Sequence, residues 1–197
     1  AVMALHSGEA DKALAAFSEH GRLHVSETRE EASSALIAAW AAKDITTPEK
    51  TLILGTTRAE VAALNSAAQA ARQEHGHLSD EGIDHKKETF HIGDRILITK
   101  NSKIRGLQNG DFGVITGIKK SPLEITVSFD NGETKSIRLQ EFEDVQLGYA
   151  TTVHKAQGAT VDRAYVLGGG PLVDKHMGLV QASRSRFETM IFLEQDE

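Results

Sequence analysis

The chain has 197 residues, of which 40% are apolar and 25% charged, enough for one sizeable hydrophobic core. It contains no cysteine, which excludes disulfides, thiolate catalysis and thiolate-bound metals, and its net charge of −6 excludes a uniformly basic surface. No apolar run approaches the roughly 20 residues that span a bilayer, and no export signal opens the chain, so we expect a cytoplasmic protein without a membrane partner.

Two helices and a short strand are predicted in the first fifty residues. Residues 8–21 place apolar side chains on one helical face and stop at a glycine, and residues 23–25 have the pattern of a strand. A second helix over residues 28–43 opens with Thr28 three residues before Glu31, which is the pattern of a capping box. The alanine-rich character of this region favours helices packed on a sheet, and therefore an α/β fold.

The segment "TLILGTTRAEVAALN" predicts a buried parallel strand over residues 51–55, followed by a helix that reaches Gly76. We expect free N–H groups in the first turn of this helix, beside Thr56, Thr57 and Arg58. Such a turn is suited to bind an anion, with the threonine hydroxyls and the arginine assisting. The alternative is that Thr57 only caps the helix and Arg58 is a solvated side chain.

From Glu88 the pattern changes to short β-branched runs separated by glycines, with the hairpin signal "DNGE" among them. Four or five such strands predict a small SH3-sized barrel inserted into the α/β pattern. Residues 91–120 hold six basic side chains against two acidic ones, and loops that include Lys103 and Arg105 suit phosphate contacts. A basic but idle barrel rim remains the alternative.

Four histidines precede or open the barrel, at positions 75, 77, 85 and 91. Their spacing follows no regular helical pattern, and no cysteine accompanies them, so we predict no metal site. We interpret this polar stretch instead as a flexible, solvated lead-in to the barrel.

After the barrel comes "YATTVHKAQGAT", which crowds unlike donors and acceptors onto one turn between two strand-like runs. A strand is predicted over residues 163–167, a helix over residues 179–186 that carries Arg184 near its end, and a last strand over residues 189–193. Lys175 is not preceded by glycine or followed by serine or threonine, so the segment "GGGPLVDK" is not a P-loop.

These last motifs resemble motifs V and VI of the superfamily-one helicases, as "YATTVHKAQGAT" is followed about twenty residues later by "GLVQASRSR". The resemblance is to the RecD-like branch that includes the relaxase-helicases of conjugative plasmids (TraA, TraI and TrwC types). Residues 51–65 are similar to the motif IV region of that branch, and an SH3-like insertion before motif V is typical of it. In motif VI, Gln181, Ala182 and Ser183 replace the more common Ala-Leu-Thr, and the arginine is kept.

The resemblance implies the domain organisation. Residues 1–87 and 146–197 would form the second RecA-like motor domain, a parallel sheet with flanking helices, and residues 88–145 the inserted SH3-like β-barrel. The Walker A lysine and the Walker B acids belong to the first motor domain of such helicases and have no counterpart here. We therefore expect half of a 5′ to 3′ DNA motor, inactive alone, whose ATP and Mg²⁺ are bound mainly by the missing half.

The resemblance also implies roles for individual residues. Arg184 would act as the arginine finger on the γ-phosphate, with Arg58 as a second candidate for catalysis and phosphate binding. Gln157 and Gly158 would face the nucleotide. A further set would contact single-stranded DNA: Thr56, Thr57, Thr151, Thr152, His154, Lys155, Lys103 and Arg105.

The expected partners are single-stranded DNA, the N-terminal RecA-like domain of the same parent chain and other conjugation proteins. Two alternatives remain open at this stage. The first is a non-catalytic nucleic-acid-binding accessory module in which the barrel makes the contacts. The second is an unrelated α/β enzyme, although no nucleophile and base pair stands out in the sequence.

Overall fold

The computed structural model describes residues 17–152, 155–156, 160–168 and 184–195. The chain divides into two compact units. Unit 1 comprises Ala1–Leu64 and Ala150–Glu197, and unit 2 comprises Asn65–Tyr149. Unit 2 is thus inserted into unit 1, and two points of the chain join them.

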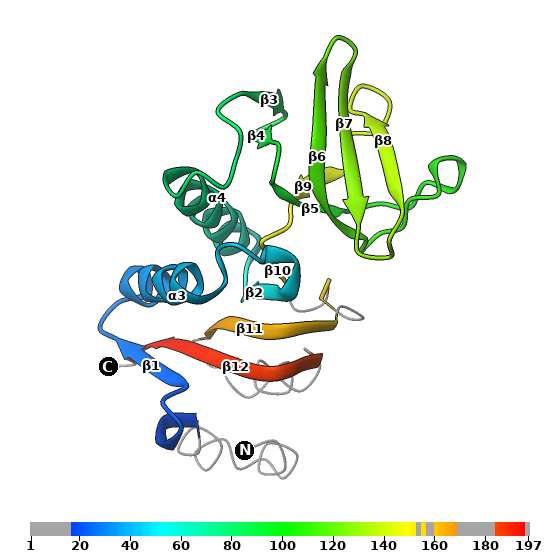
Figure 1. Ribbon diagram of the computed structural model, residues 1–197. Coiled ribbons are helices and arrows are strands. Elements are labelled where there is room, and N and C mark those ends of the chain that lie inside the picture. The colour runs from blue at the N-terminus through cyan, green and yellow to red at the C-terminus, as the bar shows by residue number, and fades with distance from the viewer. Residues whose placement is uncertain (1–16, 153–154, 157–159, 169–183, 196–197) are drawn as a thin grey trace. The chain divides into compact units, whose positions relative to one another are not determined.

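Unit 1 contains one five-stranded sheet in the order β1-β12-β11-β2-β10 (Figure 1). Every pairing in this sheet is parallel. Consequently all five strands end at the same edge, which we call the carboxyl edge, and begin at the opposite, amino edge. The strands are β1 (Leu23–Ser26), β2 (Thr51–Gly55), β10 (Ala150–Thr152), β11 (Thr160–Gly168) and β12 (Arg184–Glu194).

Two of the predicted helices are confirmed with their caps, whereas most of the helix predicted over residues 8–21 lies outside the described residues. Helix α3 (Arg29–Asp44) begins with the capping box of Thr28 and Glu31, and helix α4 (Arg58–Glu74) begins after Thr57. Helix α3 packs against β1, β12 and β11 (Figure 1). It buries its apolar face there, through Ala32, Leu36 and Trp40. A short 3₁₀ turn, η1 (Pro48–Lys50), leads into β2, whose five residues are all buried as predicted.

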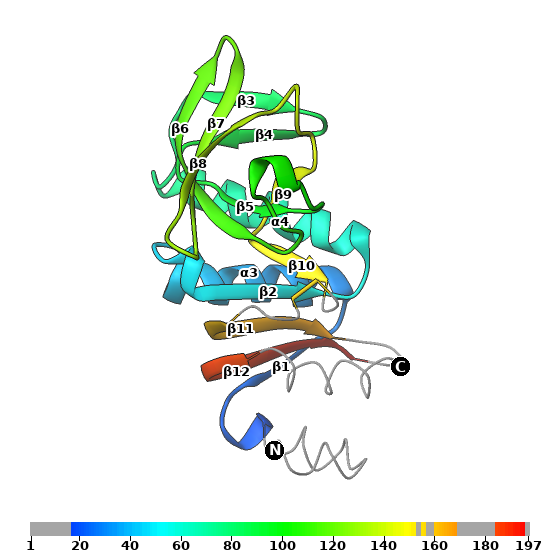
Figure 2. The same cartoon turned by 90° about the vertical axis from the view of Figure 1, so that its right-hand side faces the viewer.

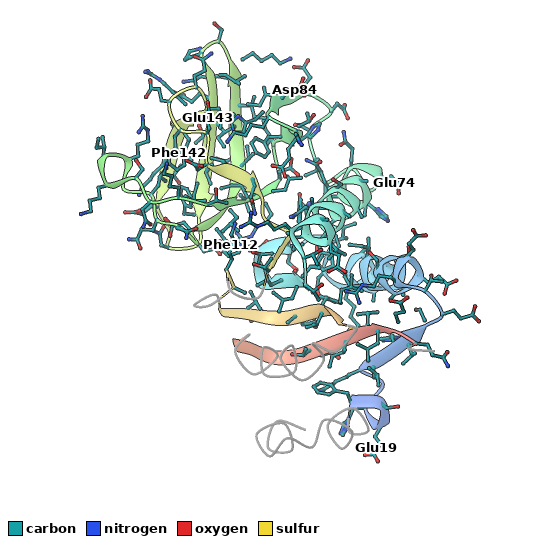
Figure 3. The ribbon with its side chains drawn as sticks, turned by 180° about the vertical axis from the view of Figure 1, so that it is seen from behind. Glu19, Glu74, Asp84, Phe112, Phe142 and Glu143 are labelled. Atoms are coloured by element: carbon teal, nitrogen blue, oxygen red, sulfur yellow. The ribbon has the colours of Figure 1, made fainter. Side chains whose placement is uncertain are left out.

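Unit 2 contains a five-stranded antiparallel sheet in the order β8-β7-β6-β5-β9, with a separate hairpin of β3 and β4 (Figure 2). Its core includes Phe112 and Phe142, both labelled in Figure 3. A 3₁₀ turn, η2 (Lys103–Arg105), lies in the loop after β5. The strands are β3 (Gly82–His85), β4 (Glu88–His91), β5 (Arg95–Ile98), β6 (Phe112–Lys120), β7 (Leu123–Phe129), β8 (Thr134–Arg138) and β9 (Val145–Leu147).

The prediction of a flexible lead-in to the barrel is wrong. Residues 82–85 and 88–91 pair as an antiparallel hairpin, and both His85 and His91 are buried. The ring of His85 contacts the Glu143 carbonyl oxygen at 3.0 Å, and that of His91 contacts the Ser79 carbonyl oxygen at 2.8 Å. Polar composition concealed this order, because the histidines satisfy their ring nitrogens with backbone groups.

The last strand also begins earlier than predicted. Residues 179–183 lie outside the described residues, but Arg184 and Arg186 belong to β12 and not to a helix. Strand β12 pairs with β11 from Arg184↔Thr160 onward, so backbone pairing along the whole of β11 outweighs the local helical pattern.

Candidate functional site

The sheet brings several of the predicted DNA-contacting residues to its carboxyl edge. Strand β2 ends at Gly55, directly before Thr56 and Thr57, and β10 ends at Thr152. These strands are neighbours, and Thr152 pairs with Gly55. Residues 97 positions apart in the chain thus lie side by side, at the edge where parallel α/β sheets bind their ligands.

The first turn of α4 is less open than the sequence predicts. The N–H groups of Thr56 and Thr57 donate to Oε2 of Glu60 at 3.0 and 3.1 Å, and the Thr56 hydroxyl donates to the same oxygen. The N–H of Glu60 in turn donates to Oγ1 of Thr57 at 3.1 Å. The expectation of free N–H groups beside Thr56 and Thr57 is therefore wrong, because a carboxylate of the chain itself already occupies this anion site.

Glu60 is held from its other side by Arg29, the first residue of α3. Arg29 donates Nε and Nη2 to Oε1 of Glu60 at 2.9 and 2.7 Å, and its Nη1 donates to the carbonyl oxygen of Gly168. Arg29 thereby links three parts of the chain: its own segment after β1, the segment after β2 that carries Glu60, and the end of β11. The capping pattern of Thr57 and Glu60 is visible in the sequence, but nothing in it indicates Arg29, which lies 31 positions before Glu60.

The pair of Arg29 and Glu60 lies at a topological switch point. In the sheet, the strand that follows β2 is β10, on one side of the adjacent pair β2 and β11. The strand that follows β11 is β12, on the other side of that pair. Strands β2 and β11 are adjacent and parallel. In open α/β sheets the crevice outside such a pair of strands is the usual ligand site. Here Arg29 and Glu60 link the ends of these two strands.

The start of the motif V turn is described in part. The carbonyl oxygen of Thr152 accepts from the N–H groups of Lys155 and Ala156 at 3.0 and 3.1 Å, which forms one tight turn beyond β10. Thr152 is half-buried and Lys155 is exposed. His154, Gln157 and Gly158 lie outside the described residues.

Thr151 differs from its neighbours. Its side chain is fully buried, and Oγ1 has no hydrogen-bond partner among the described residues. Side chains alternate along a strand, so Thr151 points to the covered face while Thr152 lies at the partly exposed one. The DNA contact of Thr151 stays a prediction, and the buried side chain of Thr151 distinguishes it from Thr152.

Arg184 lies at the opposite edge from Arg58. Arg184 pairs with Thr160 at the start of β11, whereas Leu54, near the end of β2, pairs with Val166. Six residues of β11 separate these levels, which corresponds to about 20 Å of sheet at about 3.3 Å per residue. The backbone positions of the two predicted phosphate-binding arginines thus lie at opposite edges of the sheet, and their assignment to one nucleotide stays a prediction.

An ion network also marks the amino side of the sheet. Arg163 donates Nη1 to Oδ1 of Asp44 at 2.5 Å and Nε to Oε2 of Glu188 at 3.1 Å. The hydroxyl of Tyr165 donates to Oδ2 of Asp44 at 2.6 Å. Burial and this carboxylate raise the pKa of Tyr165 well above its usual range. Arg163 is consequently neutralised by two acids and is not a free phosphate ligand.

The predicted basic face of the barrel is largely neutralised as well. Arg105 pairs with Glu141 at 3.1 Å, and Arg95 is buried against Asp130 with a contact of 2.6 Å. Lys103 is exposed and has no acidic partner within the described part of the chain. The remaining cations of residues 91–120 also face acids: Lys100 pairs with Asp144, Lys119 with Glu124 and Lys120 with Glu81.

Across the described ranges, no three or more His, Asp or Glu side chains form a group that could hold a metal ion. Within the same residues, no helix is both long and apolar enough to cross a bilayer.

Comparison with known proteins finds one family model. The ATP-dependent RecD-like DNA helicase SH3 domain matches residues 64–129, which lie almost entirely in unit 2. Among curated proteins, the conjugal transfer protein TraA of Agrobacterium fabrum is 31% identical over 192 residues. The probable conjugal transfer protein TraA of Sinorhizobium fredii is 32% identical over 193 residues. Both alignments cover 95% of this chain but 17% of the relative.

A further relative is the ATP-dependent RecD2 DNA helicase of Deinococcus radiodurans, which is 39% identical over 67 residues, 34% of this chain and 9% of that protein. Among solved structures, a Bacteroides Pif1 helicase in complex with ADP-AlF3 and single-stranded DNA matches with a TM-score of 0.53 at 19% identity. That match covers 83% of this chain and 45% of the Pif1 chain, and it supports the predicted RecA-like fold. Together, the sequence matches and the fold identify the chain as the C-terminal region of a RecD-like superfamily-one helicase, similar to TraA.

Proposed function

We propose that the chain is the second motor half of an ATP-dependent DNA helicase that acts in conjugative DNA transfer and moves 5′ to 3′. In this proposal, unit 1 is the second RecA-like motor domain and unit 2 is an inserted SH3-like barrel. Its partners are single-stranded DNA, the first RecA-like domain of the same protein and other conjugation proteins. The sequence similarity to TraA over 95% of the chain supports this assignment.

The observation that carries the proposal is the convergence of two separate segments on the carboxyl edge. Thr57 and Arg58 come from the start of α4, and Thr152 and Lys155 from the end of β10 and its turn. Exposed hydroxyl groups and cations on one edge suit the phosphate backbone of a DNA strand. We assign Thr57, Arg58, Thr152 and Lys155 to this strand, with His154 from the same turn.

The nucleotide is assigned to the amino edge. Arg184 begins β12 there, and the alternative arginine on β11, Arg163, is already neutralised by Asp44 and Glu188. When ATP and Mg²⁺ are bound, the nucleotide supplies the phosphoryl group whose hydrolysis drives movement. Arg184 would donate its guanidinium hydrogens to the γ-phosphate, with Gln157 and Gly158 nearby. ATP and Mg²⁺ are assigned mainly to the other motor half.

The path of the chain supports coupling between the two ligands. Thr152 ends β10 at the carboxyl edge, and Thr160 begins β11 at the amino edge beside Arg184. Residues 153–159 therefore lead from the proposed DNA contacts to the proposed nucleotide contacts. A change in nucleotide state at one edge would act on the grip on DNA at the other.

Binding of the 197-residue chain to a labelled single-stranded oligonucleotide, measured by fluorescence anisotropy over a salt series, tests the proposal. We expect salt-dependent binding that Lys155→Ala weakens about three- to tenfold at low salt, because one phosphate contact is lost. The matched control is Lys120→Ala, which removes an exposed lysine that Glu81 already neutralises. Absence of binding would overturn the assignment, and equal effects of both variants would move the contact to the barrel.

The catalytic role is tested in the longer protein that also contains the first motor domain. Arg184→Ala is expected to lower DNA-stimulated ATP turnover by about 10³-fold or more, because the γ-phosphate loses its cation. Arg184→Lys keeps the charge but not the planar fork, so we expect only partial recovery. Unchanged turnover in Arg184→Ala would favour a non-catalytic accessory module.

A further inference from the structure

The ion pair of Arg29 and Glu60 forms a densely bonded polar cluster at the carboxyl edge, and none of the roles assigned above uses it. Oε2 of Glu60 accepts three hydrogen bonds from Thr56 and Thr57, and Oε1 accepts two from Arg29. Arg29 is also tied to the end of β11 through the Gly168 carbonyl oxygen. All five polar hydrogens that reach the carboxylate thus come from the turns that surround it.

The hydrogen bonds determine which threonine can face a ligand as a donor. Partial burial raises the pKa of Glu60, but the hydrogen bonds from Thr56, Arg29 and Thr57 outweigh it and keep that pKa below the usual range. An ionised carboxylate is an acceptor only, so the Thr56 hydroxyl must donate its hydrogen to Glu60. The Thr57 hydroxyl accepts the N–H of Glu60 and keeps its own hydrogen available. Thr57 is exposed, whereas Thr56 is half-buried.

We propose that Arg29 is a positioning residue for the nucleic-acid contact, which neutralises Glu60 so that Thr57 and Arg58 can meet a DNA phosphate. This inference rests on the proposed function of the carboxyl edge. In addition, Glu60 takes the place of an external anion in the crevice between β2 and β11. The hydroxyl group that this turn offers to a ligand as a donor is that of Thr57, and not that of Thr56.

The electrostatic reason lies in the position of the carboxylate. Glu60 is in the same helical turn as Thr57 and Arg58, so a phosphate bound there comes within about one Debye length of its negative charge. With Arg29 in place, at 2.7 Å, the pair is neutral. Without Arg29 the carboxylate would repel the phosphate. Arg29 therefore promotes binding without touching DNA.

A double-mutant cycle on the 197-residue chain separates charge neutralisation from a merely structural role. The variants are Arg29→Ala, Glu60→Gln and the double variant, each titrated with the labelled single-stranded oligonucleotide at low and at high salt. Glu60→Gln keeps an acceptor for the threonines and removes the charge. Lys43→Ala is the matched control, because it deletes a cation of α3 that pairs with Glu188 instead.

We expect Arg29→Ala to weaken binding about three- to tenfold at low salt, with the difference shrinking as salt rises. The double variant should return to within about twofold of Glu60→Gln, because the uncompensated charge is gone. In the same titration, Thr57→Val should weaken binding and Thr57→Ser should not, since serine keeps the donor.

Unchanged binding in Arg29→Ala, or a loss that the double variant does not recover, would overturn the inference. Failure of the proposed function gives a different result, because the unaltered chain would then not bind the oligonucleotide or would be insensitive to Lys155→Ala. Circular dichroism of each variant reports whether it is folded. If Arg29→Ala acted only through a structural defect, adding Glu60→Gln would leave or enlarge that defect, so recovery of binding in the double variant would identify the charge as the cause.

Discussion

Replacing Asp94 by asparagine is predicted to destabilise unit 2 despite the small chemical change. Asp94 is fully buried and accepts three hydrogen bonds, each of 2.7 Å. Oδ1 accepts from the Tyr149 hydroxyl, and Oδ2 accepts from Nε2 of Gln69 and from the N–H of His91. Gln69 lies on α4 and Tyr149 directly precedes β10, so one carboxylate ties together both chain segments that join unit 2 to unit 1.

The magnitude follows from the acceptors that remain. An asparagine has one oxygen, so whichever way the amide lies, its NH₂ group replaces an acceptor of at least one of the three donors. One lost hydrogen bond to a charged acceptor is worth about 1.5 to 3 kcal/mol. Burial raises the pKa of Asp94, so removal of a buried charge offsets part of this loss. The expected net loss is about 2 kcal/mol.

Thermal unfolding followed by circular dichroism measures the effect. For a chain of this size, about 2 kcal/mol corresponds to a fall in Tm of roughly 4 to 8 °C. Asp84→Asn is the matched control, because Asp84 is exposed and accepts one hydrogen bond, from Thr89 at 2.8 Å. A fall in Tm of less than about 1 °C for Asp94→Asn, or an equal fall for both variants, would refute the reasoning.

Three further outcomes are expected. Burial and the nearby charge of Asp94 raise the pKa of Glu88, so the stability of the fold decreases as pH rises from the unfolded to the folded pKa of this group. Glu88→Gln should therefore raise Tm at pH 7 and leave it unchanged at pH 4. A gain in Tm that persists at pH 4 would contradict this. Trp40→Phe removes the 3.0 Å hydrogen bond from Nε1 to the Thr51 hydroxyl, and urea unfolding should show a loss of about 1 to 2 kcal/mol, against none if that bond is dispensable. Lys103→Ala should change oligonucleotide affinity less than about twofold if the strand lies on unit 1, whereas a tenfold loss would assign the strand to the barrel.

Local patterns predicted the elements of unit 1 well where one signal dominated. The capping boxes and the run of five apolar residues in β2 each depend on neighbours in the chain, and all are present in the structure. Trp40 lies on the buried face of α3 at the helical spacing of Ala32 and Leu36, and it is 1% exposed. Such features could be predicted because the interacting groups are close in sequence.

The candidate site depended on contacts that are distant in sequence. Arg29 reaches Glu60 across 31 positions and Gly168 across 139, and no local pattern indicates either contact. The neutralisation of Arg105 by Glu141 is of the same kind. A count of basic residues over positions 91–120 predicted a positive barrel rim. The acids that pair with these residues lie outside that segment, so the count missed them.

The positions of Arg58 and Arg184 show most directly how register determines function. Both follow patterns typical of phosphate contacts, and sequence alone places them together. In a parallel sheet a residue after a strand and a residue at the start of a strand necessarily lie at opposite edges, here separated by about 20 Å. Because the two backbone positions are so far apart, we expect the two arginines to serve different ligands. If Arg184 contacts the nucleotide, Arg58 belongs with the DNA strand, and residues 153–159 are the segment through which a substitution would alter both contacts.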